Sequence, residues 1–177
     1  HSGCVFIGKD AGLTAYTGNN NIAIGYGAMD DTDADATVGA SDENVFIGTN
    51  SGGGTWETSA TARNVCVGNA TMTGNLDAAN YNAALGFEAL RDTTSGKFNT
   101  STGYRSGSSM LAGSYNTSVG AQSGDTITTG TNNVYIGMHA EASAADVTYE
   151  IVIGTGVDNS NAFAGAGTET CKIGRAS

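Results

Sequence analysis

A glycine recurs along the chain at nearly constant spacing, and this repeat restricts the fold more than any other feature. Ten copies of a short apolar segment end in a glycine: Gly8, Gly25, Gly48, Gly68, Gly86, Gly103, Gly120, Gly137, Gly154 and Gly174. The intervals are 17, 23, 20, 18, 17, 17, 17, 17 and 20 residues, so the base period is 17 with a few insertions. Such periods are typical of solenoids, in which each repeat forms one coil and stacks on its neighbours.

Apolar alternation predicts a strand ahead of each of these glycines. The residues one and three positions before the glycine are mostly aliphatic, as in Val5 and Ile7 or Val45 and Ile47. A period of two over a short segment is typical of a strand with one buried face. We therefore expect these two positions to face the core. The glycine suits a corner with positive φ or a close backbone approach.

An asparagine stands four positions before the glycine in seven of the repeats. These residues are Asn21, Asn44, Asn64, Asn82, Asn99, Asn116 and Asn133. Identical amide side chains that stack at strand spacing can pass hydrogen bonds along the stack and satisfy backbone groups of the turns. The sequence therefore predicts a structural asparagine ladder.

The position two before the glycine is small or apolar in most repeats, as in Phe6, Phe46, Cys66 and Tyr135. If this position faces outward, it indicates burial against another copy of the chain. A narrow coil with little aliphatic content is also marginally stable alone. We predict one elongated all-β domain over 1–177, a parallel β-solenoid (β-helix or β-roll) of about ten coils that assembles as a homotrimeric rod.

The charge of the chain excludes several classes of partner. The net charge is −10, with seven lysines and arginines in 177 residues, whereas nucleic acid needs a basic surface. No apolar run approaches the roughly 20 residues that span a bilayer, so we expect no membrane insertion. Cys4, Cys66 and Cys171 are far apart and form no metal-binding motif, which predicts three free, mostly buried thiols.

Four segments carry a resemblance to a known family. They are NNIAIGYGAM (20–29), YNAALGFEAL (81–90), FNTSTGYRSG (98–107) and YNTSVGAQSG (115–124). They resemble the N-T-A-[IV]-G-[YF]-x-A-[LG] repeats of phage and viral tail-fibre proteins, which often end in an intramolecular chaperone of the endosialidase type. The repeats are also similar to those in the head domains of bacterial trimeric autotransporter adhesins.

The resemblance implies a trimeric fibre segment on a virion that attaches to a host surface glycan. Such fibres release their chaperone by self-cleavage, often after a serine, so Ser177 would be a processed end and the chain a fragment of a longer fibre. The alternative is an adhesin head on a bacterial surface. The 17-residue period, longer than the usual coil of adhesin heads, favours the fibre.

The largest insertion contains a candidate metal site. Asp31, Asp33 and Asp35 alternate as in a calcium loop, but the segment lacks the glycine and the spaced glutamate of an EF-hand. A solvated acidic loop is the competing interpretation. No other cofactor is expected.

Aromatic residues are the candidates for carbohydrate binding. Trp56, the sole tryptophan, lies beside Glu57 in the second insertion, where an exposed ring could stack on a sugar. The alternative is that Trp56 packs over the apolar edge of a coil. Tyr26, Phe87 and Tyr104 share the position after the glycine and could form an aromatic ladder.

We expect no enzymatic activity, although the acidic residues leave one alternative. A tailspike-like glycan-degrading enzyme needs two carboxylates at a working separation, and nothing in the sequence places any pair. No Ser/His/Asp arrangement can be inferred around His139. An ice-binding solenoid would repeat a threonine rank in every coil, whereas TITT (126–129) and DTTS (92–95) do not recur in register.

Overall fold

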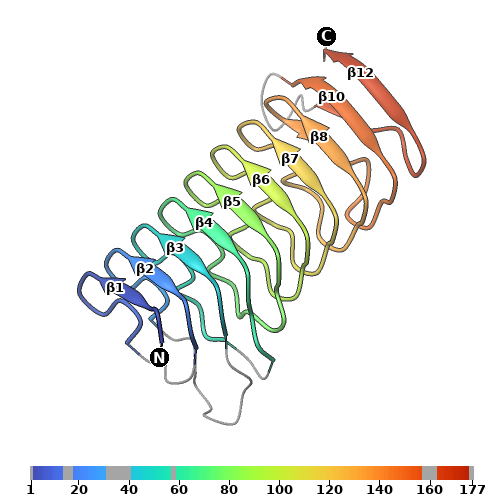
Figure 1. Ribbon diagram of the computed structural model, residues 1–177. Coiled ribbons are helices and arrows are strands. Elements are labelled where there is room, and N and C mark those ends of the chain that lie inside the picture. Colours follow the sequence, from blue (N-terminus) through green and yellow to red (C-terminus); the bar gives the residue numbers. More distant parts are fainter. Residues whose placement is uncertain (1, 14–17, 31–40, 57–58, 157–162, 176–177) are drawn as a thin grey trace.

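The computed structural model describes residues 2–13, 18–30, 41–56, 59–156 and 163–175, which form an all-β solenoid (Figure 1). The strands are β1 (Val5–Ile7), β2 (Ile22–Ile24), β3 (Val45–Ile47), β4 (Val65–Val67), β5 (Ala83–Leu85), β6 (Thr100–Thr102), β7 (Thr117–Val119), β8 (Val134–Ile136), β9 (Ala140–Glu141), β10 (Ile151–Thr155), β11 (Phe163–Ala164) and β12 (Cys171–Arg175). Ten of them form one parallel sheet in the order β1-β2-β3-β4-β5-β6-β7-β8-β10-β12, and β9 pairs with β11. The predicted parallel β-solenoid is confirmed.

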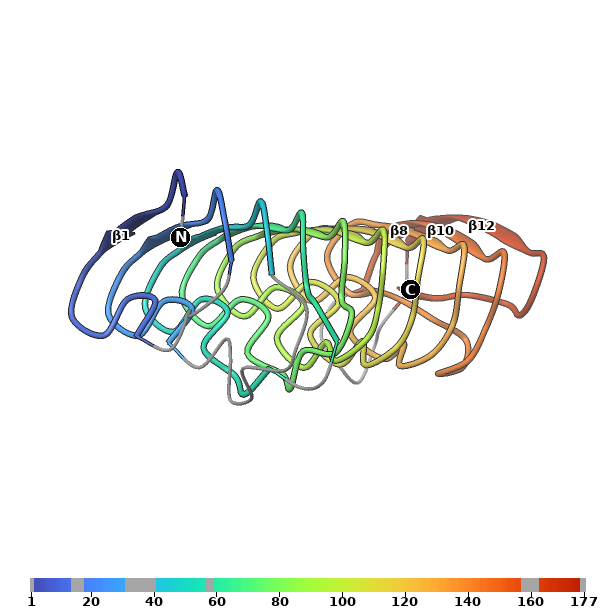
Figure 2. The same cartoon turned by 60° about the horizontal axis from the view of Figure 1, so that its bottom comes forward.

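The strands pair in register, so each column of the sequence repeat becomes a column in space. Val5 pairs with Ile22, and Ile22 in turn pairs with Val45, although the second interval contains the longest insertion. The sheet therefore keeps its register although the intervals between strands differ in length. Figure 2 shows the remainder of each coil passing beneath the strands and closing the solenoid.

The predicted assignment of the two strand faces was wrong. The position two before the glycine faces the core: Phe46, Cys66 and Tyr135 have exposed fractions of 0%. The aliphatic positions on either side of it point outward, with Ile7 56% and Leu85 52% exposed. A three-residue strand that places its middle side chain inside must place the two flanking ones outside, because successive side chains alternate. Alternation alone does not say which set is inside.

The core is narrow and is filled from both walls of the coil. The middle residues of the strands meet side chains from the opposite wall, and both sets are buried. The large members from the opposite wall are Met29, Met72, Leu76, Leu90, Met110 and Ile127. The core therefore depends on residues that the strand pattern does not reveal.

The corner glycines agree with the role expected for them. Gly68 has a φ of 143°, and a Cβ atom placed there would lie 2.3 Å from the carbonyl oxygen of Gly86 in the next coil. Any side chain would therefore clash with backbone, in a conformation that L-residues rarely adopt. The corner has room only for glycine because adjacent coils approach each other so closely.

The asparagines form a continuous ladder on the inner side of the sheet. Asn99 Nδ2 donates to Asn82 Oδ1 at 3.1 Å and to the carbonyl oxygen of Gly113 at 2.8 Å. Asn99 Oδ1 accepts from the backbone N–H and from Nδ2 of Asn116, at 3.0 and 3.2 Å. The same pattern links the other neighbours from Asn21 to Asn133. The ladder satisfies buried turn carbonyls such as that of Gly113.

None of the described segments forms a helix with the length and hydropathy needed to cross a membrane.

Candidate functional site

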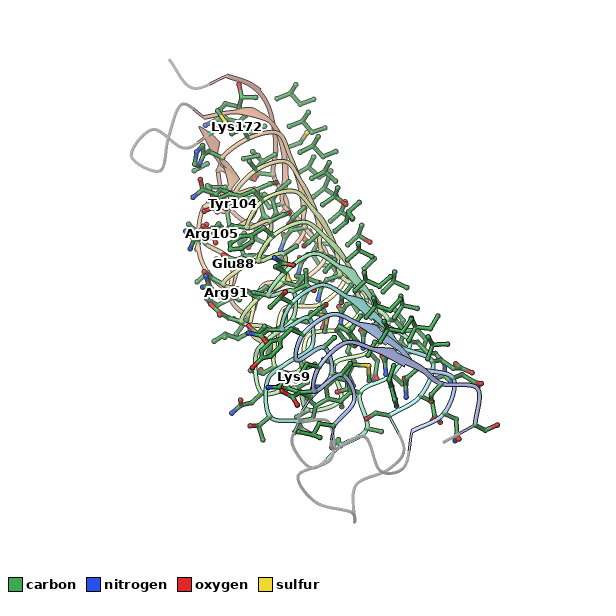
Figure 3. All side chains as sticks on the ribbon, turned by 90° about the vertical axis from the view of Figure 1, so that its left-hand side faces the viewer. Lys9, Glu88, Arg91, Tyr104, Arg105 and Lys172 are labelled. Atoms are coloured by element: carbon green, nitrogen blue, oxygen red, sulfur yellow. The ribbon has the colours of Figure 1, made fainter. Side chains whose placement is uncertain are left out.

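The outward side of the ten-stranded sheet is an exposed apolar surface that follows the strands along the rod. We call it the outer face; it consists of the first and third residues of β1 to β8, with Ile151 and Ile153 of β10 and Cys171 and Ile173 of β12. Val65 is 50% exposed and Ile173 is 72% exposed. Figure 3 shows these side chains as a row along one side of the rod. Contiguous apolar surface of this kind usually marks an interaction site.

An aromatic stack borders the outer face at the entry to three strands. The rings of Tyr81 and Phe98 lie 4.8 Å apart with planes 4° from parallel, and those of Phe98 and Tyr115 lie 4.9 Å apart at 8°. We call these three residues the aromatic ridge. Each is 42–56% exposed. Arg63 extends the stack, because its guanidinium lies over the Tyr81 ring and its Nη1 donates to the Tyr81 hydroxyl at 2.9 Å.

Sequence reasoning missed the aromatic ridge. Its members stand five positions before the glycine, in a column that also contains Gly3, Asn20, Glu43, Arg63, Asn132, Tyr149 and Glu169. All the residues of this column have φ between 55° and 70°, the left-handed region. The residues of this column differ in chemical type and share only their backbone conformation. Residue types alone therefore do not reveal the ridge. Spacing from the glycine was the one available signal.

The predicted ladder after the glycine is present in part. The rings of Phe87 and Tyr104 stack 5.8 Å apart at 11°, whereas Tyr26 lies under the ammonium of Lys9, 5.2 Å from the ring centre. Stacked rings present edges rather than faces to the solvent. Tyr104 is 49% exposed, and Ala121 follows it in the column. Tyr104 therefore keeps exposed ring surface that a ligand could contact.

Charged residues lie beside Tyr104. Arg91 is held by Asp92 Oδ2 at 2.6 Å and by Glu88 Oε2 at 2.8 Å, and Arg105 Nε lies 3.4 Å from the same Glu88 oxygen. Figure 3 shows Arg91, Glu88, Arg105 and Tyr104 one above another along the rod, away from the row of outer-face side chains. We call these four residues the charged corner. It combines an aromatic ring with polar donors and acceptors.

Trp56 lies in the core. Its exposed fraction is 2%, its Nε1 donates to the carbonyl oxygen of Gly52 at 3.0 Å, and its ring meets Phe46 edge to face at 5.8 Å. Trp56 therefore packs inside the coil, as in the second of the two interpretations given above. Its indole is not available to a sugar at the surface. Glu57, its neighbour in the proposed site, lies outside the described residues.

The candidate calcium ligands Asp31, Asp33 and Asp35 lie outside the described residues, as does Ser177. Within the described ranges no group of three or more His, Cys, Asp or Glu side chains is placed to hold a metal ion. The acidic residues next to the insertion have structural partners: Asp42 accepts the N–H of Asn19 at 2.7 Å, and Glu43 pairs with Arg63 at 2.7 Å.

The cysteines differ in environment. All three are unpaired; Cys66 is buried, Cys4 is half-buried and Cys171 is exposed on the outer face. Burial raises the pKa of the Cys66 thiol, which keeps it protonated. The expectation of mostly buried thiols is wrong for Cys171, because it occupies an outward position that sequence alternation assigned to the core.

Two carboxylic acids are buried near the end of the solenoid. Glu150 takes the ladder position after Asn133 and accepts from the Tyr135 hydroxyl at 3.2 Å and from the N–H of Gly167 at 2.9 Å. Glu141 accepts from the N–H and hydroxyl of Thr126, both at 3.0 Å. Desolvation raises the pKa of Glu141 to about 7. This carboxyl is therefore partly protonated at neutral pH.

Comparison of the chain with known protein families, curated proteins and solved structures finds no match. The functional argument therefore depends on the surfaces of the molecule itself. The two candidate surfaces are the apolar outer face and the charged corner.

Proposed function

We propose that the chain is a structural segment of a surface fibre that assembles from several copies through the outer face. The observation that carries this proposal is the outer face itself, in which aliphatic side chains stand exposed along a ten-stranded sheet. A rod built from in-register coils is stiff, and burial of a long apolar strip would hold several rods together. A homotrimer is the assembly that the resemblance to tail fibres and adhesin heads favours.

In this proposal the interface of the trimer is formed by other residues than those that the sequence analysis assigned to it. The column of Phe46 and Tyr135 fills the core of each copy, so it is not available to a partner. The outer face takes its place and is more aliphatic and more regular. Three copies with their outer faces toward a common axis would remove these side chains from water.

The attachment role would lie at the charged corner. Because this surface faces away from the outer face, it would remain accessible in the assembled fibre (Figure 3). A half-exposed aromatic ring beside arginine and carboxylate groups suits a polar ring such as that of a host glycan. Each contact would be weak, and three copies would supply avidity. A virion tail fibre is the favoured setting, and a bacterial adhesin head is the alternative.

The mass of the protein in solution tests the assembly. We expect native mass spectrometry and light scattering to give a trimer. Replacement of Ile47 and Val65 by Asp should release monomers that keep their β-sheet signal in circular dichroism, because both side chains lie outside the core. Leu111→Asp is the matched control, since Leu111 is 42% exposed but does not belong to the outer face. A wild-type monomer at micromolar concentration would refute the assembly.

A glycan array tests the attachment role separately. We expect the wild-type protein to bind at least one class of host glycan, and Tyr104→Ala to abolish this binding without changing the mass of the assembly. Tyr26→Ala is the matched control, because Tyr26 is 53% exposed and stands in the same column as Tyr104 but lies outside the charged corner. Equal glycan binding by both variants would place the receptor site elsewhere. Shortening of the bound polysaccharide over time would instead support the enzyme alternative.

A further inference from the structure

The repeat creates acceptor sequences for N-linked glycosylation in two of its coils. The ladder asparagine and the first two strand residues read Asn-Thr-Ser at 99–101 and again at 116–118. Both match Asn-X-Ser/Thr, the sequence that carries N-linked glycans in secreted proteins. In the other coils the central strand residue is neither serine nor threonine, so the ladder asparagine there does not belong to such a sequence.

The amide nitrogens of these two ladder residues use both of their hydrogens in the folded chain. Asn99 Nδ2 donates to Asn82 Oδ1 at 3.1 Å and to the carbonyl oxygen of Gly113 at 2.8 Å. Asn116 Nδ2 donates in the same way to Asn99 Oδ1 at 3.2 Å and to the carbonyl oxygen of Gly130 at 2.9 Å. An N-linked sugar replaces one of the two amide hydrogens, so it removes one of these bonds.

The space around both amides also excludes a sugar. Asn99 and Asn116 are each 1% exposed. A Cβ atom added at Gly96 would lie 3.0 Å from Asn99 Nδ2, and one added at Gly113 would lie 3.0 Å from Asn116 Nδ2. A single carbon atom is already crowded at these positions, whereas a glycan begins with a whole sugar ring. A glycan on either asparagine is therefore incompatible with the closed coil.

A third acceptor sequence lies at the surface and provides a comparison within the same chain. It reads Asn-Ala-Thr at 69–71. Asn69 is exposed, and its Oδ1 accepts from the N–H of Thr49 at 3.1 Å. It stands directly after a corner glycine, in the column of Tyr104 rather than in the ladder. Because this side chain lies outside the core, a glycan on Asn69 is compatible with the folded solenoid.

The two ladder asparagines stay accessible in a growing chain until the next coil has been made. The later partners of Asn99 are Gly113 and Asn116, which lie 14 and 17 residues further along the chain. Asn116 likewise needs Gly130 and Asn133, at the same two separations. A chain that passes glycosylation machinery during synthesis therefore presents both acceptors before the ladder can bury them.

We infer that N-linked glycosylation at Asn99 or Asn116 prevents this chain from folding, so that the chain is made and folded in a compartment where that modification does not act. A modified amide leaves its partners unsatisfied inside the core, and the continuous ladder extends the damage to the neighbouring coils. The inference goes beyond the proposed fibre, because it concerns where such a fibre can be made. It does not depend on the number of copies in the assembly.

Secretion of the full chain from mammalian cells, behind a cleavable signal peptide, tests the inference. The double variant Ser101→Ala/Ser118→Ala destroys both acceptor sequences but keeps Asn99 and Asn116, so the ladder stays intact. We expect this variant to reach the medium in a protease-resistant form with a glycan on Asn69. The wild type should be glycosylated in the ladder and reach the medium at a level at least about tenfold lower. Glycopeptide mass spectrometry of cell lysate and medium locates the glycans.

Asn69→Gln is the matched control, because it removes the surface acceptor and leaves both ladder sequences in place. We expect its level in the medium to be as low as that of the wild type. Wild type and double variant made in a bacterial cytosol should give the same β-sheet signal in circular dichroism, which separates glycosylation from any effect of the serines. Equal secretion of the two proteins would overturn the inference, as would a protease-resistant secreted wild type, whether Asn99 and Asn116 carry glycans or not.

Discussion

The inner and outer sides of the main sheet differ in composition and in exposure, although they belong to the same short strands. On the inner side the central residue ranges from Ala84 and Ser101 to Phe46 and Tyr135, and every one of these is buried. On the outer side valine, isoleucine and leucine fill most positions, with Ala83, Thr100, Thr102, Thr117 and Cys171 as the exceptions, yet Ile7 and Leu85 are more than half exposed. Hydrophobicity alone therefore assigns the two sides incorrectly.

The difference teaches that packing against the opposite wall, rather than hydrophobicity, distinguishes the two sides. Each inner residue packs against its own part of the opposite wall, so its size adapts to local neighbours: Phe46 meets Trp56 and the backbone of Gly52, and Ser101 lies near Gly107. An outer column has no such local partner within the chain. Its mostly aliphatic composition fits the proposed assembly, in which a neighbouring copy would run along the rod.

Removing one inner amide should have the largest effect on stability. Asn99→Leu leaves the backbone N–H and Nδ2 of Asn116 and the carbonyl oxygen of Gly113 without the partners that Asn99 supplies. Each unsatisfied buried polar group costs about 1–3 kcal/mol, so we expect a loss of at least about 3 kcal/mol in the free energy of unfolding. Urea unfolding followed by circular dichroism measures this loss.

The control for this prediction lies on the outer side of the same strand. Thr102→Val replaces a half-exposed residue with the aliphatic type that is common in its column, and we expect a change within about 0.5 kcal/mol. If Asn99→Leu were as mild as Thr102→Val, the asparagine ladder would not be the element that holds the inner side together.

The sequence predicted those features that repeat in register. The coil period, the strand before each glycine and the asparagine column follow from spacing alone, because stacked coils place equivalent residues side by side. The glycine corner is explained by the contact between Gly68 and the Gly86 carbonyl, which allows no Cβ atom.

Other features depend on three-dimensional packing, which the repeat does not encode. Alternation defines two faces of a strand but does not say which is inside, because that depends on residues such as Met110 from the opposite wall. Trp56 lies in an insertion that occurs once, so no column constrains it. The aromatic ridge is defined by a shared left-handed conformation in a chemically mixed column.

An ionisable group on the inner side should make the stability of the solenoid depend on pH. Burial raises the pKa of Glu141 from its usual value of about 4.5 to about 7. The folded state therefore binds this proton more tightly than the unfolded state does. The stabilising contribution is complete below about pH 4.5 and is lost as the pH rises to about 7, by at most about 3 kcal/mol. Unfolding free energies between pH 5 and 8 measure the slope.

Glu141→Gln isolates this contribution, because a glutamine oxygen can still accept from the N–H and hydroxyl of Thr126 but cannot ionise. We expect the variant to lose the part of the pH dependence that falls between pH 4.5 and 7. Titration of the exposed acidic residues affects both proteins equally and cancels in the difference. Parallel pH profiles for the two proteins would mean that Glu141 ionises as freely in the folded state as in the unfolded one.

The smallest effect concerns two hydroxyl groups on the inner side of β6 and β7, in the two coils with the most polar strands. Ser101 and Ser118 are 1% and 0% exposed, and among the described residues their Oγ atoms have no hydrogen-bond partner. Replacing either serine by alanine removes an unsatisfied polar group, so we expect a gain of about 1 kcal/mol in the free energy of unfolding.

For two further serines in the same coils, we expect substitution by alanine to change the free energy of unfolding in the opposite direction. Ser106 Oγ donates to the carbonyl oxygen of Ser118 at 2.8 Å, and Ser123 Oγ donates to that of Tyr135 at 2.9 Å. Both are fully buried, so alanine at either position should lower the free energy of unfolding by about 1 kcal/mol. Calorimetric melting of the four variants compares the signs directly. A loss of stability in Ser101→Ala and Ser118→Ala would mean that water enters the core here and satisfies both hydroxyls, because only a satisfied hydroxyl makes its removal unfavourable.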